Sequence, residues 1–505
     1  MSASLDLKSA FATGQDLEEK MDEQPALDII VKLCRTLAVE KIDYCHWKSN
    51  TFLNRSANGE NDLDLLISRE HGQSFAEILY RLGFKETLIP KEEELPGVRD
   101  YYGWDRKSGR LVHVHAHFQL ILGNDLSKNY RLPIERVYLD SSVQGDLFRL
   151  PACEFELVVL VIRMVLKHST WDSILMRHGQ LSKTERCELI DLATEETLSR
   201  VDTVLTYFPG LKKSLFDLCL QSLQPGSPYW TRVRAGGQLQ RVLRACARYP
   251  HWLDVGSKFS RRIWQPIQRR VFRLKPKNRF ASGGLFIAIV GGDGAGKTTV
   301  IEKLQQWLSG KFEVKKLHMG KPEWSWTTTV IRGILKLGTL LRLYPFEGDV
   351  YEESLQPHGI PWFIRAVCTA RDRYLTYIQA QRLSSSGSLV LCDRYSFPYF
   401  MKMDGPQCEE AIPASRKMNW LLKFLVNRET YYYQQIRLPD LLIVLKVDPE
   451  IAVQRKTEET ETSVRARSSE VWGLDWEKLS AFEINANRSK EEALSQVKSI
   501  IWEHL

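Results

Sequence analysis

A glycine-rich loop between an apolar run and a helical pattern constrains the fold of this chain more than any other feature. Residues 291–298 read GGDGAGKT and fit the pattern G-x-x-x-x-G-K-[ST]. The preceding run 285–290 (LFIAIV) is typical of a parallel strand buried on both faces. Residues 297–308 have helical spacing and stop before Gly310. Strand, loop and helix in this order predict a phosphate-binding loop, because loop amides and the helix N-terminus then face one anion. A chance glycine turn is the alternative.

The residues of this loop predict a site for ATP and Mg²⁺. Glycines leave room for the backbone to close in on a phosphate chain from several sides. Lys297 would neutralise the β- and γ-phosphates, and the Thr298 hydroxyl would complete a Mg²⁺ shell. We assign these residues to ATP binding: Gly291, Gly292, Asp293, Gly294, Ala295, Gly296, Lys297, Thr298 and Thr299.

Length and composition indicate a multidomain enzyme of the cytoplasm. A chain of 505 residues is too long for one core, and 43% hydrophobic and 26% charged residues are ordinary for globular proteins. No apolar run reaches the roughly 18 residues that span a bilayer. The first residues, MSASLDLKSAFATGQDLEEK, lack the pattern of a secretory signal. Nine scattered cysteines without a C-x-x-C pair suggest neither a disulfide framework nor a zinc site.

Pattern shifts divide the chain into four segments. After a tail at 1–23, residues 24–151 mix helical periodicity with strand-like runs and predict an α+β region. Residues 152–280 are mainly helical, and 281–505 begin at the small-residue stretch ASGG. In this last segment strand-like runs alternate with helices, so we predict an α/β fold with a doubly wound parallel sheet.

The helical segment is strongly basic. Residues 206–280 hold sixteen Lys and Arg against two acidic residues, which leaves a net charge of +14. Trp230, Trp252 and Trp264 lie among them, and Pro266 is expected to interrupt a single long amphipathic helix. This mixture suits an anionic surface, either a membrane, which would make the protein peripheral, or nucleic acid. A structural connector with a solvated face is the alternative.

A carboxylate follows the strand-like run 389–392. Asp393 and Arg394 would lie at the ligand edge of the parallel sheet, where a carboxylate holds Mg²⁺ water or orients an acceptor. Asp393 therefore joins Thr298 as a candidate metal ligand.

The segment from about 284 to 505 resembles thymidylate kinase and its nucleoside monophosphate kinase relatives. The matching pieces are GGDGAGKTT, TARDRYLTYIQAQ, LCDRY, LPDLLIVLKVDPEIAVQRK and FEINAN. The resemblance implies that Asp293 lies near the acceptor sugar and that Asp393 and Arg394 arrange metal water and acceptor phosphate. It also implies catalytic lid arginines at Arg465 and Arg467, beside Lys297, and a homodimer.

The acceptor pocket departs from that family. The stretch MGKPE at 319–323 stands where the family has Arg-Glu-Pro-Gly, and 367–369 lacks the aromatic residue that stacks on thymine. Arg332, Arg371 and Arg373 remain candidates to bind the acceptor, or are surface helix charges. We therefore expect a nucleotide or another phosphorylated acceptor, with dTMP a poor one.

The first globular segment carries a second set of charged residues. Asp62 and Asp64 share one face of a strand, a pairing that can hold a divalent ion against a triphosphate. The stretch YCHWKSN…GENDLDLLI resembles the nucleotidyltransferase superfamily, with Lys48-Ser49 in place of Gly-Ser. In a strand predicted over 111–122, His115 takes the place of the third acid, which favours Mn²⁺ or Zn²⁺ over Mg²⁺. A polar sheet face without chemistry is the alternative.

Two classes of function follow. The first is an ATP-dependent phosphotransferase acting on a nucleotide, sugar or glycan-linked acceptor, fused to a nucleotidyltransferase-like region. The second is a nucleic-acid end-modifying or nucleic-acid-binding protein that uses the basic segment 206–280.

Overall fold

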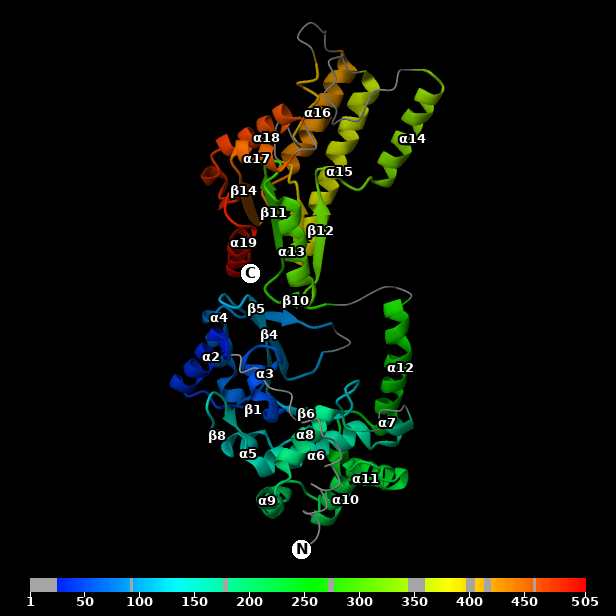
Figure 1. The fold of residues 1–505 in the computed structure, drawn as a ribbon. Helices are drawn as coiled ribbons and strands as arrows, with labels where there is room; N and C mark the ends of the chain where they lie inside the picture. The colour runs from blue at the N-terminus through cyan, green and yellow to red at the C-terminus, as the bar shows by residue number, and fades with distance from the viewer. Residues whose placement is uncertain are drawn as a thin grey trace. The chain divides into compact units, whose positions relative to one another are not determined.

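The chain divides into two compact units, each described by itself. The structure is a computed structural model and describes residues 25–90, 94–175, 180–270, 277–343, 359–396, 405–412, 419–456 and 460–505. Unit 1 comprises Met1–Pro276 and unit 2 comprises Lys277–Leu505 (Figure 1). The predicted tail at 1–23 lies outside the described residues. The division falls four residues before the predicted boundary at 280/281.

Unit 1 contains a mixed sheet covered by helices on one face. Five of its strands pair in the order β1-β2-β5-β4-β3, with β2 and β5 parallel and the other pairs antiparallel. These strands are β1 (Tyr44–His46), β2 (Leu63–Ile67), β3 (Lys85–Leu88), β4 (Val98–Asp105) and β5 (Arg110–His117). Helices α2 (Asp28–Val39) and α4 (Gly72–Arg81) pack on its apolar face with Val112, Val114 and Ala116. The alternation of β5 leaves its histidines on the opposite face.

The predicted strand 111–122 breaks at Phe118 and Gln119. Its second part forms β6, which pairs with β7 in a separate two-stranded sheet. The remaining small elements of this region are β6 (Leu120–Leu122), β7 (Tyr130–Leu132), β8 (Val143–Gln144), β9 (Arg149–Leu150), α3 (Leu53–Ala57), α5 (Glu135–Asp140), η1 (Asn50–Phe52) and η2 (Arg69–His71).

The two regions predicted at 24–151 and 152–280 share one hydrophobic core. Helix α6 (Cys153–His168) is buried along most of its length and packs with Trp47, Leu120 and Tyr138 from the first region. The other helices of this region are α7 (Trp171–Leu175), α8 (Lys183–Leu192), α9 (Glu195–Leu205), α10 (Lys213–Leu223), α11 (Tyr229–Val242), η3 (Leu243–Cys246) and α12 (His251–Arg270). Residues 24–151 therefore depend on the following helices to cover their apolar surface.

Helix α12 corrects one expectation. Pro266 lies inside the helix and does not interrupt it. Proline removes one hydrogen bond to the preceding turn, but its position is near the C-terminal end of the helix, where few later turns depend on that bond. In the first half of the same helix, Asp254 and Lys258 form a buried ion pair of 2.8 Å between Oδ2 and Nζ.

Unit 2 contains the predicted parallel sheet. Its order is β12-β13-β11-β14-β15, and every neighbouring pair is parallel. The strands are β11 (Leu285–Gly291), β12 (Val314–His318), β13 (Leu389–Asp393), β14 (Leu441–Lys446) and β15 (Phe482–Asn485), and the short strand β10 (Arg279–Phe280) precedes them. Strand β11 lies at the centre and is buried throughout, which agrees with its uninterrupted apolar sequence.

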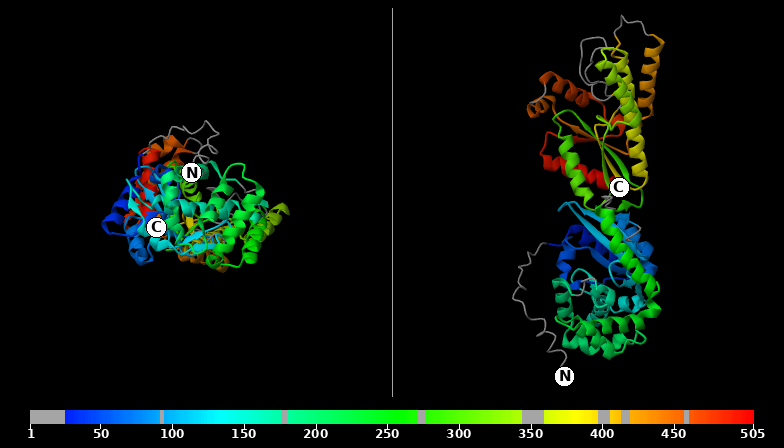
Figure 2. Two further views of the ribbon diagram at one scale, coloured as in Figure 1. Left: turned by 90° about the horizontal axis from the view of Figure 1, so that it is seen from below. Right: turned by 90° about the vertical axis from the view of Figure 1, so that its right-hand side faces the viewer.

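Helices cover both faces of this sheet (Figures 1 and 2). Helix α15 contacts β11, β12 and β13 on one face, while α13 and α19 pack on the other. The helices of unit 2 are α13 (Lys297–Ser309), α14 (Trp326–Leu340), α15 (Ile360–Ser385), α16 (Trp420–Gln435), α17 (Pro449–Arg455), α18 (Glu461–Gly473), η4 (Glu477–Leu479) and α19 (Lys490–His504). Asp448 caps α17 by accepting from the Glu450 amide, and Ser489 caps α19. In the described part of the chain, no helix combines the length and the apolar character that crossing a membrane requires.

Candidate functional site

The phosphate-binding loop of unit 2 has the predicted local geometry. It joins the end of β11 to the start of α13, and Gly296 caps that helix with φ 84°, a left-handed conformation that glycine adopts without strain. A Cβ at Gly292 would lie 2.7 Å from the Ser468 Oγ atom, so α18 packs directly on the loop backbone. Thr298 and Thr299 are exposed at the first turn of α13.

Lys297 is buried and turned back onto the loop. Its Nζ atom donates to the carbonyl oxygens of Gly291 and Gly292 at 2.9 and 2.8 Å. Burial lowers the pKa of Lys297 to about 8; Asp293 opposes this shift and Arg394 adds to it. The ammonium group thus lies inside the loop, where a phosphate chain would replace carbonyl contacts with stronger charge-assisted ones.

A single carboxylate of the loop gathers three cationic side chains. Asp293 is 2% exposed, and its oxygens lie 2.8 Å from Arg467 Nε, 3.6 Å from Lys456 Nζ and 3.7 Å from Arg394 Nη2. With Lys297, these make four cations against the carboxylates of Asp293 and Asp393. Excess charge of one sign is costly in a partly buried site, so this end of the sheet is suited to bind a polyanion.

Asp393 and Arg394 end the strand beside the loop. Asp393 is buried and pairs in register with Ile289 of β11 and His318 of β12. Arg394 has φ 54°, a left-handed conformation that costs a non-glycine residue about 1–2 kcal/mol. Backbone strain of this kind concentrates at functional sites, and here it accompanies a guanidinium group aimed at Asp293.

The two predicted lid arginines lie in different places. Arg467 contacts Asp293 in the loop. Arg465, two residues earlier on α18, instead forms a two-pronged ion pair with Glu450 of α17, at 2.8 and 2.9 Å. Both partners of that pair are largely exposed. The structure therefore brings Arg467, and not Arg465, to the phosphate-binding loop.

The three arginines predicted to bind the acceptor also have different contacts. Arg373 is buried, and it donates to the backbone carbonyls of Met319 and Gly320 at 3.0 and 3.2 Å, so it fixes the turn after β12. Arg371 donates to the Thr327 hydroxyl. Arg332 donates to Thr369 at 3.2 Å, and its guanidinium lies 4.3 Å from the ring centroid of Trp324.

Sequence reasoning missed three residues of this site. Lys456 and Ser468 reach the loop from α17 and α18, and Ser468 donates to the Asp293 carbonyl at 3.4 Å. Trp324 supplies an aromatic ring near Thr369, in the neighbourhood where 367–369 itself has none. Lys456 ends the piece LPDLLIVLKVDPEIAVQRK and Ser468 follows Arg467, but the local sequence does not show that these residues or Trp324 come close to the site, because each does so only through folding.

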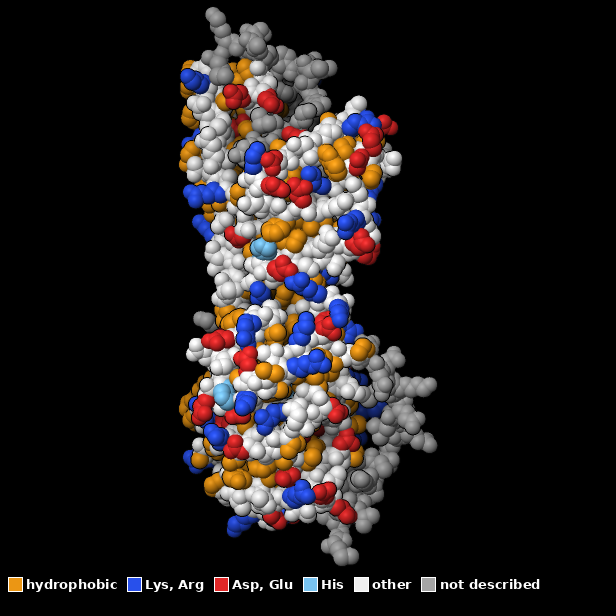
Figure 3. Space-filling view, turned by 90° about the vertical axis from the view of Figure 1, so that its left-hand side faces the viewer, with side chains coloured by type: hydrophobic (Ala, Val, Ile, Leu, Met, Phe, Trp, Pro, Cys, Tyr) orange, Lys and Arg blue, Asp and Glu red, His pale blue; other side chains and the backbone are white. Residues whose placement is uncertain are grey.

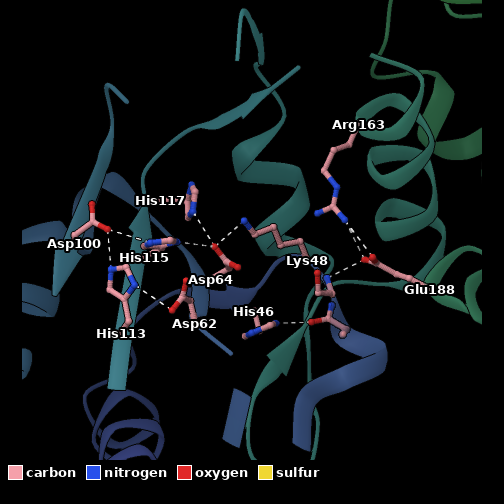
Figure 4. A network of polar contacts seen from close by, with 12 residues as sticks. His46, Lys48, Asp62, Asp64, Asp100, His113, His115, His117, Arg163 and Glu188 are labelled. Atoms are coloured by element: carbon pink, nitrogen blue, oxygen red, sulfur yellow. Dashed lines mark hydrogen bonds and ion pairs between the residues drawn. The ribbon is translucent and has the colours of Figure 1, made fainter. Parts of the chain in front are cut away.

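In unit 1, acids and histidines alternate across three neighbouring strands (Figure 4). Asp64 of β2 and Asp100 of β4 both lie opposite His115 of β5 in the sheet register. The two nitrogens of His115 lie 3.2 Å from Asp64 Oδ1 and 3.1 Å from Asp100 Oδ1. His113 lies between Asp100 and Asp62, at 2.9 and 3.1 Å, and His117 Nε2 lies 3.3 Å from Asp64 Oδ1.

Each acid of this network faces a nitrogen atom, and these contacts shift the pKa values of its members. Burial would raise the pKa of Asp64, but the Lys48 ammonium at 2.8 Å and the two histidines hold it well below its usual range. Burial likewise opposes ionisation of Asp100, yet its two histidine partners lower its pKa to about 2. Burial lowers the pKa of His115, and its contacts with Asp100 and Asp64 outweigh that effect and raise it to about 9. Burial lowers the pKa of His117 to about 4.

The predicted metal residues Asp62, Asp64 and His115 do come together on one face of the sheet. The three carboxylates of the network are separated by imidazoles, and His115 stands between Asp64 and Asp100. Mg²⁺ requires oxygen ligands in near-octahedral order. The predicted nucleotide-dependent Mg²⁺ or Mn²⁺ binding and the nucleotidyltransferase resemblance stay predictions.

A cavity of about 430 Å³ lies beside this network. Asp64, Lys48 and Lys128 line it together with residues of the helical region, among them Arg163 and Lys167. Burial lowers the pKa of Lys128 to about 8, and Lys48 adds to the shift. Arg163 and Lys167 are paired with Glu188 and Glu185, so the walls carry both signs of charge.

The basic segment is partly engaged inside unit 1. Arg232 donates to the His168 carbonyl at 2.8 Å, and Arg261 donates to the Leu126 carbonyl. The three tryptophans are exposed: Trp230, Trp252 and Trp264. On the face drawn in Figure 3, Lys and Arg side chains are interspersed with Asp and Glu in both units.

The sheet order, the loop and the buried lysine define unit 2 as a P-loop nucleotide-binding unit. No protein-family model matches the chain. It is 25% identical to the uncharacterized ATP-binding protein YghR of Escherichia coli over 225 residues, 43% of this chain and 86% of that protein. It is 26% identical to a probable thymidylate kinase of Staphylothermus marinus over 236 residues, 44% of this chain and 98% of that one.

A thymidylate kinase of Shouchella clausii is 32% identical over 176 residues, 34% of this chain and 67% of that protein. The solved thymidylate kinase of Candida albicans is similar to 44% of this chain and 94% of its own, with 18% identity and a TM-score of 0.29. With about two fifths of its length matched, the chain belongs to the thymidylate kinase family of ATP-binding kinases.

Proposed function

We propose that unit 2 transfers the terminal phosphoryl group of ATP to an acceptor that itself carries a phosphate. The observation that carries this proposal is the group of four cations, Lys297, Arg394, Lys456 and Arg467, around the single loop carboxylate of Asp293. A nucleotide triphosphate alone would engage the loop and Lys297. The additional arginines and lysine suit the charge that spreads over the transferred group and the acceptor.

Each residue has a distinct part in this mechanism. The loop amides and Lys297 hold the β- and γ-phosphates, and Arg467 and Arg394 neutralise charge at the transferred group. Asp293 would keep these cations in place before ATP arrives, and its contacts with Arg394 and Arg467 support this role. The Thr298 hydroxyl and the Asp393 carboxylate are oxygen donors that fit Mg²⁺, which would offset phosphate charge when bound.

The acceptor is proposed to bind toward α14 and α15. Arg332 lies over Trp324 and contacts Thr369, so an aromatic ring and a guanidinium group are already assembled there. Arg371 lies nearby on the α14–α15 contact through Thr327. Arg332 lies over the Trp324 ring, but Trp324 is 56% exposed, so part of this ring stays open to a planar group of the acceptor.

A labelled-ATP assay with a panel of acceptors tests this function. Purified protein is incubated with nucleoside monophosphates, sugar phosphates, unphosphorylated sugars and oligonucleotides. We expect transfer to a phosphorylated small molecule and a kcat/KM for dTMP below about 10⁴ M⁻¹s⁻¹. Efficient transfer to dTMP would contradict the acceptor proposal, and no transfer to any phosphorylated small molecule would contradict the proposed function.

A second candidate, an action on nucleic acid or at a membrane, is favoured by the exposed tryptophans of the basic segment. Membrane or polyanion binding through Lys and Arg weakens with added salt. Liposome co-sedimentation with anionic and neutral lipids, beside RNA and DNA gel shifts at low and high salt, separates the two partners. Absence of binding to all of them at low salt would leave 206–280 as a structural connector.

A further inference from the structure

The histidine face of unit 1 carries chemistry that the proposed kinase does not use. We propose that Asp64, His115 and His117 bind one divalent transition-metal ion, of which Zn²⁺ is the representative, without the help of a nucleotide. One carboxylate and two imidazoles form a ligand set that zinc and its neighbours in the periodic table accept and that Mg²⁺ does not favour.

The separations of the ligand atoms agree with a metal site. Asp64 Oδ1 lies 3.2 Å from His115 Nδ1 and 3.3 Å from His117 Nε2, and the three ligand atoms lie within 4.8 Å of one another. In a tetrahedral site with arms of about 2.0–2.1 Å, neighbouring ligand atoms are about 3.3 Å apart. Two of the three separations thus match a tetrahedral site, and the third, between the two imidazole nitrogens, is at most 4.8 Å, so an ion can replace the protons between these groups after a small adjustment of the side chains.

A carboxylate already supports the central ligand. The second nitrogen of His115 lies 3.1 Å from Asp100 Oδ1, and Asp100 is 2% exposed. A metal-bound histidine commonly gives its other N–H to a carboxylate, which fixes the ring and makes it a better ligand. Three adjacent strands thus present the ligand Asp64, the ligand His115 and the supporting acid Asp100 in one row.

A second group of similar composition, Asp62, His113 and His115, fits less well. The Asp62 side chain is 44% exposed, whereas that of Asp64 is 13% and that of His117 is 6%. The His113 ring is also stacked on Tyr102 at 4.1 Å between ring centroids. Water therefore competes more strongly for a cation at Asp62 than at Asp64.

The Lys48 ammonium group already places a cation beside the proposed ligand Asp64. Its Nζ atom lies 2.8 Å from the same Asp64 oxygen that faces both histidines. Asp64 and Lys48 also line the cavity described above, so the ion would be reached from that cavity. Binding of the ion then competes with the Lys48 ammonium for one carboxylate oxygen, which predicts that removal of this lysine strengthens metal binding.

The experiment uses the full chain, purified without a histidine tag and stripped with a chelator. Titration with Zn²⁺ is followed by calorimetry, and Co²⁺ serves as the visible-absorbing probe of a tetrahedral site. We expect one tight site that excess Mg²⁺ does not fill and that persists in Lys297→Ala. That last result separates this inference from the proposed kinase function.

Four variants decide the assignment. His117→Asn should weaken Zn²⁺ binding by at least about 100-fold and Asp100→Asn by about 10–100-fold. Lys48→Met should strengthen it, and His71→Asn, a histidine outside the network, should leave it unchanged. If His117→Asn fails to fold, the opposite effects of Asp100→Asn and Lys48→Met still decide. Unchanged affinity in those variants, or binding only in the presence of a nucleotide, would overturn the proposal.

Discussion

The two units place their charged side chains on β-sheets in opposite ways. In unit 2, three cations contact the loop carboxylate Asp293 and Lys297 is buried in the same loop, so positive charge is in excess. In unit 1, every acid of the histidine face lies within 3.3 Å of an imidazole or ammonium nitrogen, so each carboxylate already has a partner. Both sites nevertheless consist of residues on β-strands and of residues that directly follow β-strands.

This difference separates a site prepared for an anion from one that is satisfied by itself. Surplus cations near a glycine loop are tolerated because a phosphate ligand compensates them on binding. A network whose acids already have partners has no such need, and a ligand enters it only by replacing a proton or an ammonium group. Activity should therefore be far more sensitive to single charges in unit 2 than in unit 1.

The largest expected effect is that of Lys297→Ala. Removing this ammonium group should lower ATP-dependent phosphoryl transfer by about 10²–10³-fold, because charge stabilisation is lost while little packing changes. Steady-state kinetics with the best acceptor of the panel, together with circular dichroism, is the measurement. Wild-type turnover in a folded Lys297→Ala variant would show that activity does not depend on this charge, which contradicts the proposed difference between the two units.

Glu156, in the first turn of α6, is a buried acid of unit 1 that is destabilised when it is charged. Burial raises its pKa to about 7, and the neighbouring Glu188 adds to the shift. A carboxyl group with a raised pKa in the folded state favours folding when protonated, so stability falls as pH rises through the range from 4.5 to about 7. Glu156→Gln should then stabilise unit 1 by about 3 kcal/mol at pH 8 and by less than about 1 kcal/mol at pH 5.

Urea unfolding of the full chain at both pH values measures this difference. Glu196→Gln, at an exposed position of α9, is the matched control and should change neither value. An equal gain at both pH values would show that shape, and not ionisation, explains the effect of Glu156→Gln.

The smallest expected effect is the difference in activity between substitutions of two arginines of α18. Arg467→Gln should lower kcat by about tenfold or more, since it removes a cation from the loop. Arg465→Gln should stay within about twofold of the wild type, because its exposed pair with Glu450 contributes little. The ratio of the two kcat values is the readout, and equal losses would mean that the helix as a whole, not the charge at Asp293, matters.

Much of unit 2 could be predicted from its sequence because its signals are local. The strand 285–290, the loop and the helix from Lys297 follow one another directly, and the structure confirms all three. The cap of α17 is equally local, because Asp448 directly precedes Pro449 and accepts from the Glu450 amide. Such features depend on neighbours a few positions away.

The remaining residues could not be predicted because they meet only through tertiary packing. Lys456 and Ser468 reach the loop from about 160 or more positions along the chain, and although Lys456 ends a quoted piece and Ser468 follows Arg467, their local sequence does not show this contact. Asp100 is an isolated acid on β4, and only the sheet register shows that it faces His115. The same limit explains Arg465, since two lid arginines in one motif do not reveal which of them points inward.

The core shared by α6 and the first region has a consequence for how this protein can be divided or recombined. Trp47, Leu120 and Tyr138 are covered by residues from beyond position 151, so a cut there would expose the apolar interior of both pieces. A cut between 276 and 277 instead separates two sets of mostly internal contacts. In gene fusions, limited proteolysis or expression of fragments, residues 1–276 should therefore behave as one unit.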